Sequence, residues 1–258
     1  MIYPNWIYYP DDDLELFIDT VQQVSYVTST DHQEYKGAID GRSKIKATQS
    51  LPTATFECTW DTNHIKDIYR YLEYLRGKEV IMAFGPQNLA SYVKIVEASI
   101  PWTIGTVQKV SLSVQFLGNV RGQFWEAESD DMISSGTEIP IDSDSIASGG
   151  QSRDFESGYW GSVSIDQSDI VLPPGEYTYF IRAKKVSSNA TLTRSIYNNN
   201  DMTAIANEDI SLTSTSYKII TVDFTVSSTD AGDEIRFWIG NSGSYAFKVD
   251  FLGFVAKP

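Results

Sequence analysis

Two carboxylates that could act together stand at Glu126 and Glu128, within WEAES at residues 125–129. If this segment is a β-strand, residues two apart point to the same face, so the carboxylates lie side by side. Like charges in that position repel each other unless a cation or solvent relieves them. Ca²⁺ does so readily, because it accepts carboxylate and carbonyl oxygens from several segments. The pattern therefore predicts a calcium site, the alternative being an exposed acidic edge that binds nothing.

Aromatic and amide side chains in turn-rich stretches could hold a sugar, which needs a ring to stack on and polar groups to reach its hydroxyls. The predicted carbohydrate-binding residues are Tyr159, Trp160, Tyr197, Asn198, Asn199 and Tyr245. Trp160 has a second interpretation as a core residue, since it alternates, imperfectly, with Val163 and Ile165. Trp238, inside EIRFWI, is predicted to lie in the core. A sandwich that has lost sugar binding stays open as an alternative.

Signatures of catalysis are scarce. The two histidines, His32 and His64, fall in a predicted loop and at a predicted helix start, which excludes a histidine-rich metal site. The sequence holds no G-x-S-x-G elbow, phosphate-binding loop or dinucleotide fingerprint. A glycosidase needs only two carboxylates, but either half of the chain is small for a hydrolase cleft. We therefore predict that the protein is not an enzyme, and we assign no catalytic residue.

The 258 residues carry a net charge of −14, most of it in the second half. Residues 1–121 hold 11 basic and 14 acidic residues, and residues 122–258 hold 9 and 20. An acidic surface favours solubility and disfavours nucleic-acid phosphates. Cys58 is the only cysteine, so no intrachain disulfide forms, and its apolar strand predicts a core position. Neither a secretory signal nor a membrane-spanning stretch is recognisable, and we expect first assembly in the cytosol.

The elements that must position these residues begin with one helix. Apolar residues at helical spacing predict it within residues 64–77, with one stripe lying on a sheet: Ile65, Ile68, Leu72 and Leu75. Asp61 and Thr62 offer capping oxygens, and Gly77 tolerates a left-handed exit. Strands are predicted at 53–60, 80–84, 91–100 and 107–117, the last alternating with a period of two from Gln108 onward.

The flanking segments differ in character. Residues 1–20 mix aromatics with prolines and aspartates, and we expect them to pack on another surface, a neighbouring subunit being one candidate. Residues 30–48 are polar and are predicted to form a long loop. After residue 121 short strands separated by turn residues, at 175–186, 217–226, 233–240 and 245–255, predict a β-sandwich.

Four short motifs follow one another in the second half: WEAES at 125–129, GYWGSVSID at 158–166, PPGEYTYFIRA at 173–183 and FKVDFLGFV at 247–255. In this order they resemble the galactose-binding-like jelly roll of carbohydrate-binding module families 6 and 35. There, E-A-E opens the first strand, G-x-Y leads an inner strand, and an aspartate of the closing strand faces the E-A-E. The resemblance implies glycan binding and a structural calcium held by Glu126 and Glu128, with Asp250 nearby.

The first half resembles the tube-like domain of tailed-phage tail proteins, above all the distal tail protein. The resemblance covers residues from about 20 to 120. It lies in the strand–helix–strand–strand order, the helix ending in YLEYLRGK, the strand VIMAFG and the final SLSVQFLGN. Distal tail proteins often carry a C-terminal galectin-like or carbohydrate-module-like sandwich, so each half supports the interpretation of the other. The resemblance implies a hexameric ring.

We therefore predict a mainly β fold with one short helix: a tail-tube-like β-sandwich or barrel domain at 1–121 and a jelly-roll β-sandwich at 122–258. The predicted function is a virion structural protein of a tailed virus, forming a homohexameric ring at the distal tail end (the baseplate) and displaying a glycan-binding sandwich. Its expected partners are the tube protein, the tail hub and host surface glycan, without sequence-specific nucleic-acid binding or membrane insertion. The expected location is the virion tail, assembled in the host cytoplasm. The alternatives are a major tail-tube protein with a decoration domain and a stand-alone carbohydrate-binding protein.

Overall fold

The computed structural model describes residues 5–18, 20–27, 30–36, 43–49, 51–59, 65–84, 89–99, 109–117, 122–136, 138–156, 161–165, 170–186, 190–241 and 246–258. The chain forms two compact units. Unit 1 takes in Met1–Phe17, Ile81–Ser91 and Val120–Pro258, and unit 2 takes in Ile18–Val80 and Tyr92–Asn119. The predicted boundary between residues 121 and 122 lies beside the start of the last segment of unit 1. Unit 1 also includes two segments of the first half, because their strands extend its sheet.

Unit 2 is an antiparallel sheet with one helix. Its strands follow the order β3 (Thr20–Val27), β6 (Thr53–Thr59), β9 (Lys109–Phe116) and the second part of β8 (Leu89–Ser99). The predicted alternation of β9 is confirmed, because Val110, Leu112, Val114 and Phe116 are all buried. Cys58 on β6 is also buried, as predicted.

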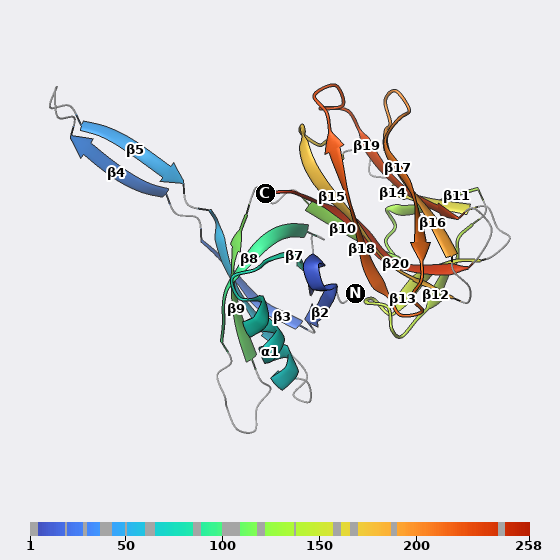
Figure 1. Ribbon diagram of the computed structural model, residues 1–258, viewed down its shortest axis with the longest axis horizontal. Helices are drawn as coiled ribbons and strands as arrows, with labels where there is room; N and C mark the ends of the chain where they lie inside the picture. Colours follow the sequence, from blue (N-terminus) through green and yellow to red (C-terminus); the bar gives the residue numbers. More distant parts are fainter. Residues whose placement is uncertain are drawn as a thin grey trace. The chain divides into compact units, whose positions relative to one another are not determined.

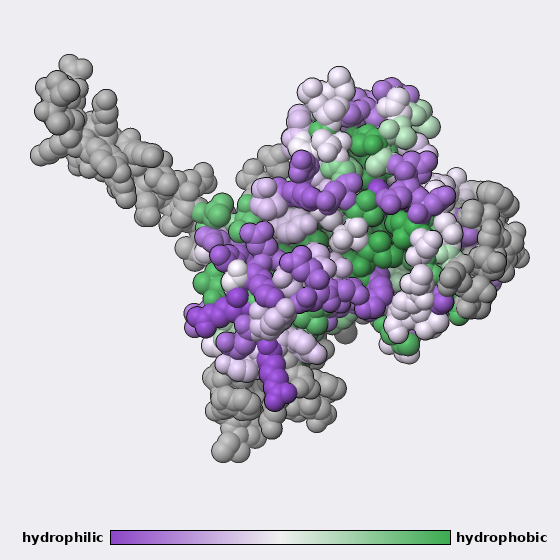
Figure 2. Space-filling model, in the orientation of Figure 1, coloured by the Kyte–Doolittle hydropathy of each residue, from purple (hydrophilic) through white to green (hydrophobic). Residues whose placement is uncertain are grey.

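The helix α1 (Ile65–Leu75) confirms the helix that the apolar spacing predicted. Leu72 and Leu75 are fully buried, while Figure 2 shows hydrophilic residues gathered over the outer face of α1. Gly77 ends the helix with a φ of 79°, a left-handed conformation that glycine adopts without strain. The predicted capping residues at 61 and 62 lie outside the described residues. No helix within the described ranges is long and apolar enough to span a membrane.

The loop predicted for residues 30–48 is wrong over most of its length. β4 (Thr30–Lys36) and β5 (Ser43–Gln49) pair in antiparallel register from Thr30 opposite Gln49 to Lys36 opposite Ser43. Figure 1 shows them as a separate two-stranded ribbon. These strands were not predicted because their sequence is polar and the prediction relied on apolar residues. Backbone hydrogen bonds between paired strands form without apolar side chains.

Unit 1 contains a β-sandwich of two antiparallel sheets (Figure 1). The first holds β10 (Gly122–Glu126), β12 (Ile141–Ser143), β13 (Gln151–Phe155), β15 (Gly175–Lys185), β18 (Lys218–Val226) and β20 (Phe247–Ala256). The second has the order β11 (Met132–Gly136), β14 (Gly161–Ile165), β19 (Ile235–Asn241), β16 (Ala190–Asn198) and β17 (Thr203–Leu212). Phe237 of β19 stacks on Phe254 of β20 across the core, with ring centroids 5.0 Å apart. The predicted class, mainly β with one short helix, is confirmed.

Trp238 is not a core residue, so that prediction is wrong. It is half-buried, while its neighbours Phe237 and Ile239 are fully buried in the core between the sheets. Successive residues of a strand point to opposite faces, so burying both neighbours turns Trp238 outward.

The first sheet continues past β10 into β8, β7 (Glu79–Phe84), β1 (Asn5–Tyr9) and β2 (Leu14–Ile18). A 3₁₀ turn at Pro10–Asp12 joins β1 to β2. Trp6 of β1 is 1% exposed and stacks on Phe251 of β20, with centroids 5.0 Å apart. Trp6 also contacts the rings of Phe180 and Phe124 edge-to-face. The predicted packing of the N-terminal segment is thus observed for its described residues, on unit 1 of the same chain.

Candidate functional site

A buried polar network joins the end of β10 to β20. The Ser148 hydroxyl lies 2.8 Å from Glu126 Oε2 and 2.8 Å from Asp250 Oδ1, so the two acceptors share one proton. The Ser148 N–H donates to both oxygens of Asp250, at 3.0 and 3.1 Å. Between Arg182 and Ala183 of β15 the register skips Asp250, which is therefore the extra residue of a β-bulge. A bulge re-aims a side chain, and here it directs Asp250 toward Glu126.

Arg182 supplies positive charge to this network. Its Nη1 donates to Asp250 Oδ2, and its Nε donates to Glu15 Oε2 at 3.0 Å. The side chains of Arg182 and Asp250 are 7% and 0% exposed, so water screens their attraction little. Glu15 also accepts the Ile219 N–H at 3.0 Å, which ties β2 to β18.

Glu126 and Glu128 retain carboxylate oxygens, Oε1 and Oε2 respectively, that are buried without a hydrogen-bond partner among the described residues. The Glu128 carboxylate lies against Gly149, where a Cβ would stand 2.3 Å from its Oε1. Burial, together with the charge of Asp250, raises the pKa of Glu126 well above the usual carboxyl range. Burial also raises the pKa of Asp250, although Arg182 and Ser148 oppose that rise.

The residues predicted to hold calcium do not form a ready-made calcium site. Both oxygens of Asp250 already accept hydrogen bonds, from Ser148 and from Arg182. Calcium requires about six to eight oxygen ligands. Within the described ranges, no group of three or more His, Cys, Asp or Glu side chains is placed to hold a metal ion. Glu126 and Glu128 each keep an acceptor oxygen that no described residue engages, and calcium binding by this chain stays a prediction.

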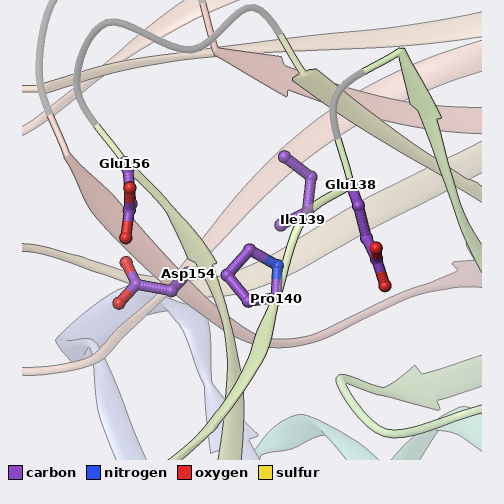
Figure 3. Close-up of a pocket in the computed structure, with 5 residues that line it drawn as sticks. All are labelled: Glu138, Ile139, Pro140, Asp154 and Glu156. Atoms are coloured by element: carbon purple, nitrogen blue, oxygen red, sulfur yellow. The ribbon is translucent and has the colours of Figure 1, made fainter.

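A pocket of about 220 Å³ lies beside β13 in unit 1. Its lining consists of Glu138, Ile139, Pro140, Asp154 and Glu156. Asp154 and Glu156 are two residues apart at the end of an extended strand, so they share a face. Figure 3 shows their carboxylates turned toward each other, with Glu138 on the far side of Pro140. The pocket therefore offers hydrogen-bond acceptors on two sides of a proline ring.

The wall of this pocket is held from behind by Arg153, which is 8% exposed. Its guanidinium donates to three backbone carbonyls, those of Ala127 (2.8 Å), Met132 (2.6 Å) and Ile139 (3.1 Å). Ile139 is itself a lining residue, so Arg153 fixes the position of that wall. Lys248 of β20 is the cross-strand partner of Asp154, and its Nζ lies 2.9 Å from Asp154 Oδ2, which orients that carboxylate.

The residues predicted to bind sugar are only partly placed. Tyr159, Trp160 and Tyr245 lie outside the described residues. Tyr197, Asn198 and Asn199 follow one another at the end of β16, and none of the three lines the pocket beside β13.

Asn198 is a buried structural residue and is not exposed for contact with a sugar. It is 1% exposed, and its amide donates to Asp230 at 3.1 Å and to Asp233 at 2.8 Å. The Asn199 N–H donates to the Glu234 carbonyl at 2.8 Å. These groups fix the loop that leads into β19, and Asn198 has no free amide proton to offer a sugar, because both protons are engaged.

Several residues of these two regions carried no assignment in the sequence: Ser148, Arg182, Glu138, Pro140, Asp154 and Glu156. The spacing of Asp154 and Glu156 was a usable signal, since it is the same two-residue spacing as in Glu126 and Glu128. No local pattern marks Arg182, because its partners Asp250 and Glu15 are 68 and 167 residues away along the chain.

Comparisons with known proteins give matches among solved structures alone. No family model matches the chain, and no curated protein matches it. The C-terminal family 6 module of the Zobellia galactanivorans laminarinase LamC matches at 15% identity, over 53% of this chain and 99% of that chain, with a TM-score of 0.39. A family 35 carbohydrate-binding module from Clostridium thermocellum matches at 16% identity, over 52% and 98%, with a TM-score of 0.40.

A third structure aligns with more of the chain. It is the exo-β-1,3-galactanase of Phanerochaete chrysosporium, at 13% identity, over 91% of this chain and 68% of that chain, with a TM-score of 0.39. At these TM-scores the similarities carry no inference about a ligand or a reaction.

Proposed function

We propose that unit 1 binds glycan through the pocket beside β13, and that the chain is a non-catalytic binding protein. The observation that supports this is the lining of the pocket. Three carboxylates accept hydrogen bonds from sugar hydroxyls, and the Pro140 ring offers an apolar surface between them. Small-ligand sites combine these features, an apolar wall with a few convergent polar groups. At about 220 Å³ the pocket suits a single sugar ring.

The lining also restricts the class of sugar. Glu138, Asp154 and Glu156 all contribute acceptors, and Lys248 offsets only one of these charges. Like charges in one site repel each other, so a uronate or another acidic sugar is disfavoured. Neutral hydroxyl-rich sugars and sugars with a free amine fit the lining.

We predict weak binding by a single site and a clear loss on neutralising it. A few hydrogen bonds of about 0.5–1.5 kcal/mol each give a Kd of roughly millimolar order. The double variant Glu138→Gln/Glu156→Gln should weaken binding by about tenfold or more, since about 1.4 kcal/mol corresponds to a factor of ten. Saturation-transfer NMR with neutral, uronate-bearing and amine-bearing oligosaccharides measures this.

Glu176→Gln is the matched control, because Glu176 is an exposed carboxylate on β15 that does not line the pocket. It should bind as the wild type does. Equal binding by the double variant, or a preference for uronates, would contradict the assignment of the site.

We also propose that the chain assembles into a ring, as a distal tail protein of a tailed virus. The resemblance of the first half to tail-tube domains supports this, and so does the hairpin β4–β5. Among the described strands, β4 and β5 pair only with each other. A lone two-stranded hairpin is marginal in water and presents unpaired backbone edges. A neighbouring copy can cover them, and head-to-tail contacts of one kind close into a cyclic oligomer.

Trimming this hairpin should abolish the oligomer. Thr30 and Gln49 stand directly opposite each other, so residues 31–48 can be replaced by Asn-Gly, which favours a tight hairpin turn. The full chain should elute as a hexamer and show rings in negative-stain electron micrographs. The trimmed chain should elute as a folded monomer, whose circular dichroism loses only the contribution of the two deleted strands. Long tubes would favour the major tail-tube alternative, and a full-length monomer the stand-alone carbohydrate-binding protein.

Assembly into a ring would also raise the apparent affinity for a polysaccharide. Several weak sites on one particle bind a polysaccharide with high effective concentration after the first contact. Ring-forming protein should therefore bind host surface polysaccharide measurably, whereas the trimmed monomer should bind it only at about millimolar sugar.

A further inference from the structure

Both oxygens of the buried Asp250 carboxylate accept hydrogen bonds from groups of this chain. Ser148 contributes three of its contacts and Arg182 the fourth. The carboxylate is fully buried, and a buried charge without a partner is strongly destabilising. An ionised Asp250 therefore needs a cationic partner at this bulge of β20.

We propose that the Arg182 guanidinium is the resident cation of this site, in the place that the family resemblance gives to calcium, and that unit 1 folds without calcium. Such a cation must contact the buried carboxylates directly, and Arg182 does. Its Nη1 reaches Asp250 and its Nε reaches Glu15, so one planar group neutralises carboxylates from two strands. A guanidinium presents several donors in fixed directions, which suits a shared position of this kind.

Aromatic rings hold the guanidinium in place. Its central carbon lies 4.7 Å from the ring centroid of Phe17 and 4.7 Å from that of Tyr217. Phe251 adds a third ring at 5.9 Å. Cations are attracted to aromatic faces at these distances, more strongly where water is excluded. The site is thus built around a cation that belongs to the chain.

Thermal unfolding of the full chain tests this. Anything that binds only the native state raises Tm with concentration. We expect the same wild-type Tm in excess chelator and in millimolar calcium, at matched ionic strength. A saturable rise of the wild-type Tm with calcium, absent with magnesium, would overturn the proposal.

The Tm values of a single and a double variant test whether the charges of Arg182 and Asp250 interact. Arg182→Met leaves Asp250 buried and unpaired, so its Tm should fall by several degrees. In Arg182→Met/Asp250→Asn the buried Asp250 charge is removed as well, although Glu15 still lacks its cation, and Tm should rise above that of Arg182→Met alone. A double variant that melts no higher than Arg182→Met would show that the pair does not matter. If Arg182→Met does not fold, the wild-type calcium comparison alone decides.

Discussion

Trp6→Ala should lower the free energy of unfolding by about 3–5 kcal/mol, the cost of removing a large buried aromatic side chain. Trp6 is 1% exposed and stacks on Phe251, and it meets Phe180 and Phe124 edge-on. Its removal leaves a cavity beside the rings of Phe124, Phe180 and Phe251 on β10, β15 and β20. Urea denaturation followed by circular dichroism measures the loss.

Trp6→Phe should lose less than half as much, because a ring remains and Trp6 Nε1 has no hydrogen-bond partner within the described part of the chain. Tyr71→Ala is the surface control: Tyr71 is 43% exposed on α1, so its change should stay within about 0.5 kcal/mol. If Trp6→Ala unfolded with the wild-type midpoint, β1 would not pack on unit 1 in solution.

The same contacts imply that residues 122–258 alone expose an aromatic face and aggregate.

Arg153→Met should lower the free energy of unfolding by roughly 3 kcal/mol and weaken glycan binding as well. The change keeps the aliphatic stem but leaves the carbonyls of Ala127, Met132 and Ile139 without their donor. Each buried acceptor left unsatisfied costs about 1–3 kcal/mol, less where it finds another donor. Ile139 forms part of the pocket wall, so the pocket should lose its shape too. Denaturation and NMR titration measure the two effects.

Arg153→Lys should recover little, because an ammonium on a flexible stem does not reach three carbonyls at once. Lys257→Met is the matched control. Lys257 pairs with Asp223, whose side chain is 61% exposed, and exposed ion pairs contribute at most about 1 kcal/mol. A loss for Arg153→Met no larger than that of Lys257→Met would mean that the three carbonyls find other partners.

Periodic, local features were predictable from the sequence. The helix at Ile65–Leu75 and the alternating strand at Lys109–Phe116 each bury one face, and burial of one face imposes a regular apolar spacing. The hairpin β4–β5 was not predictable in this way, because its sequence is mostly polar and carries no extended apolar spacing. The prediction for Trp238 was wrong because it relied on the apolar composition of the strand. The period of two places Trp238 on the same face as Arg236, opposite the buried Phe237.

Patterns among neighbouring residues were enough to predict the fold class, the helix, the sandwich strands and the two-residue spacing of the carboxylates. Which charged side chains contact each other depends on how the sheets pack. It placed Glu15 of β2 and Asp250 of β20 on the same Arg182, across 167 and 68 residues. It also turned Asp250 inward through a β-bulge and gathered Glu138, Asp154 and Glu156 around one proline. These side-chain contacts depend on strand order and register, which are set by the packing of whole sheets. The residues involved therefore carry no local sequence pattern that would reveal the contact.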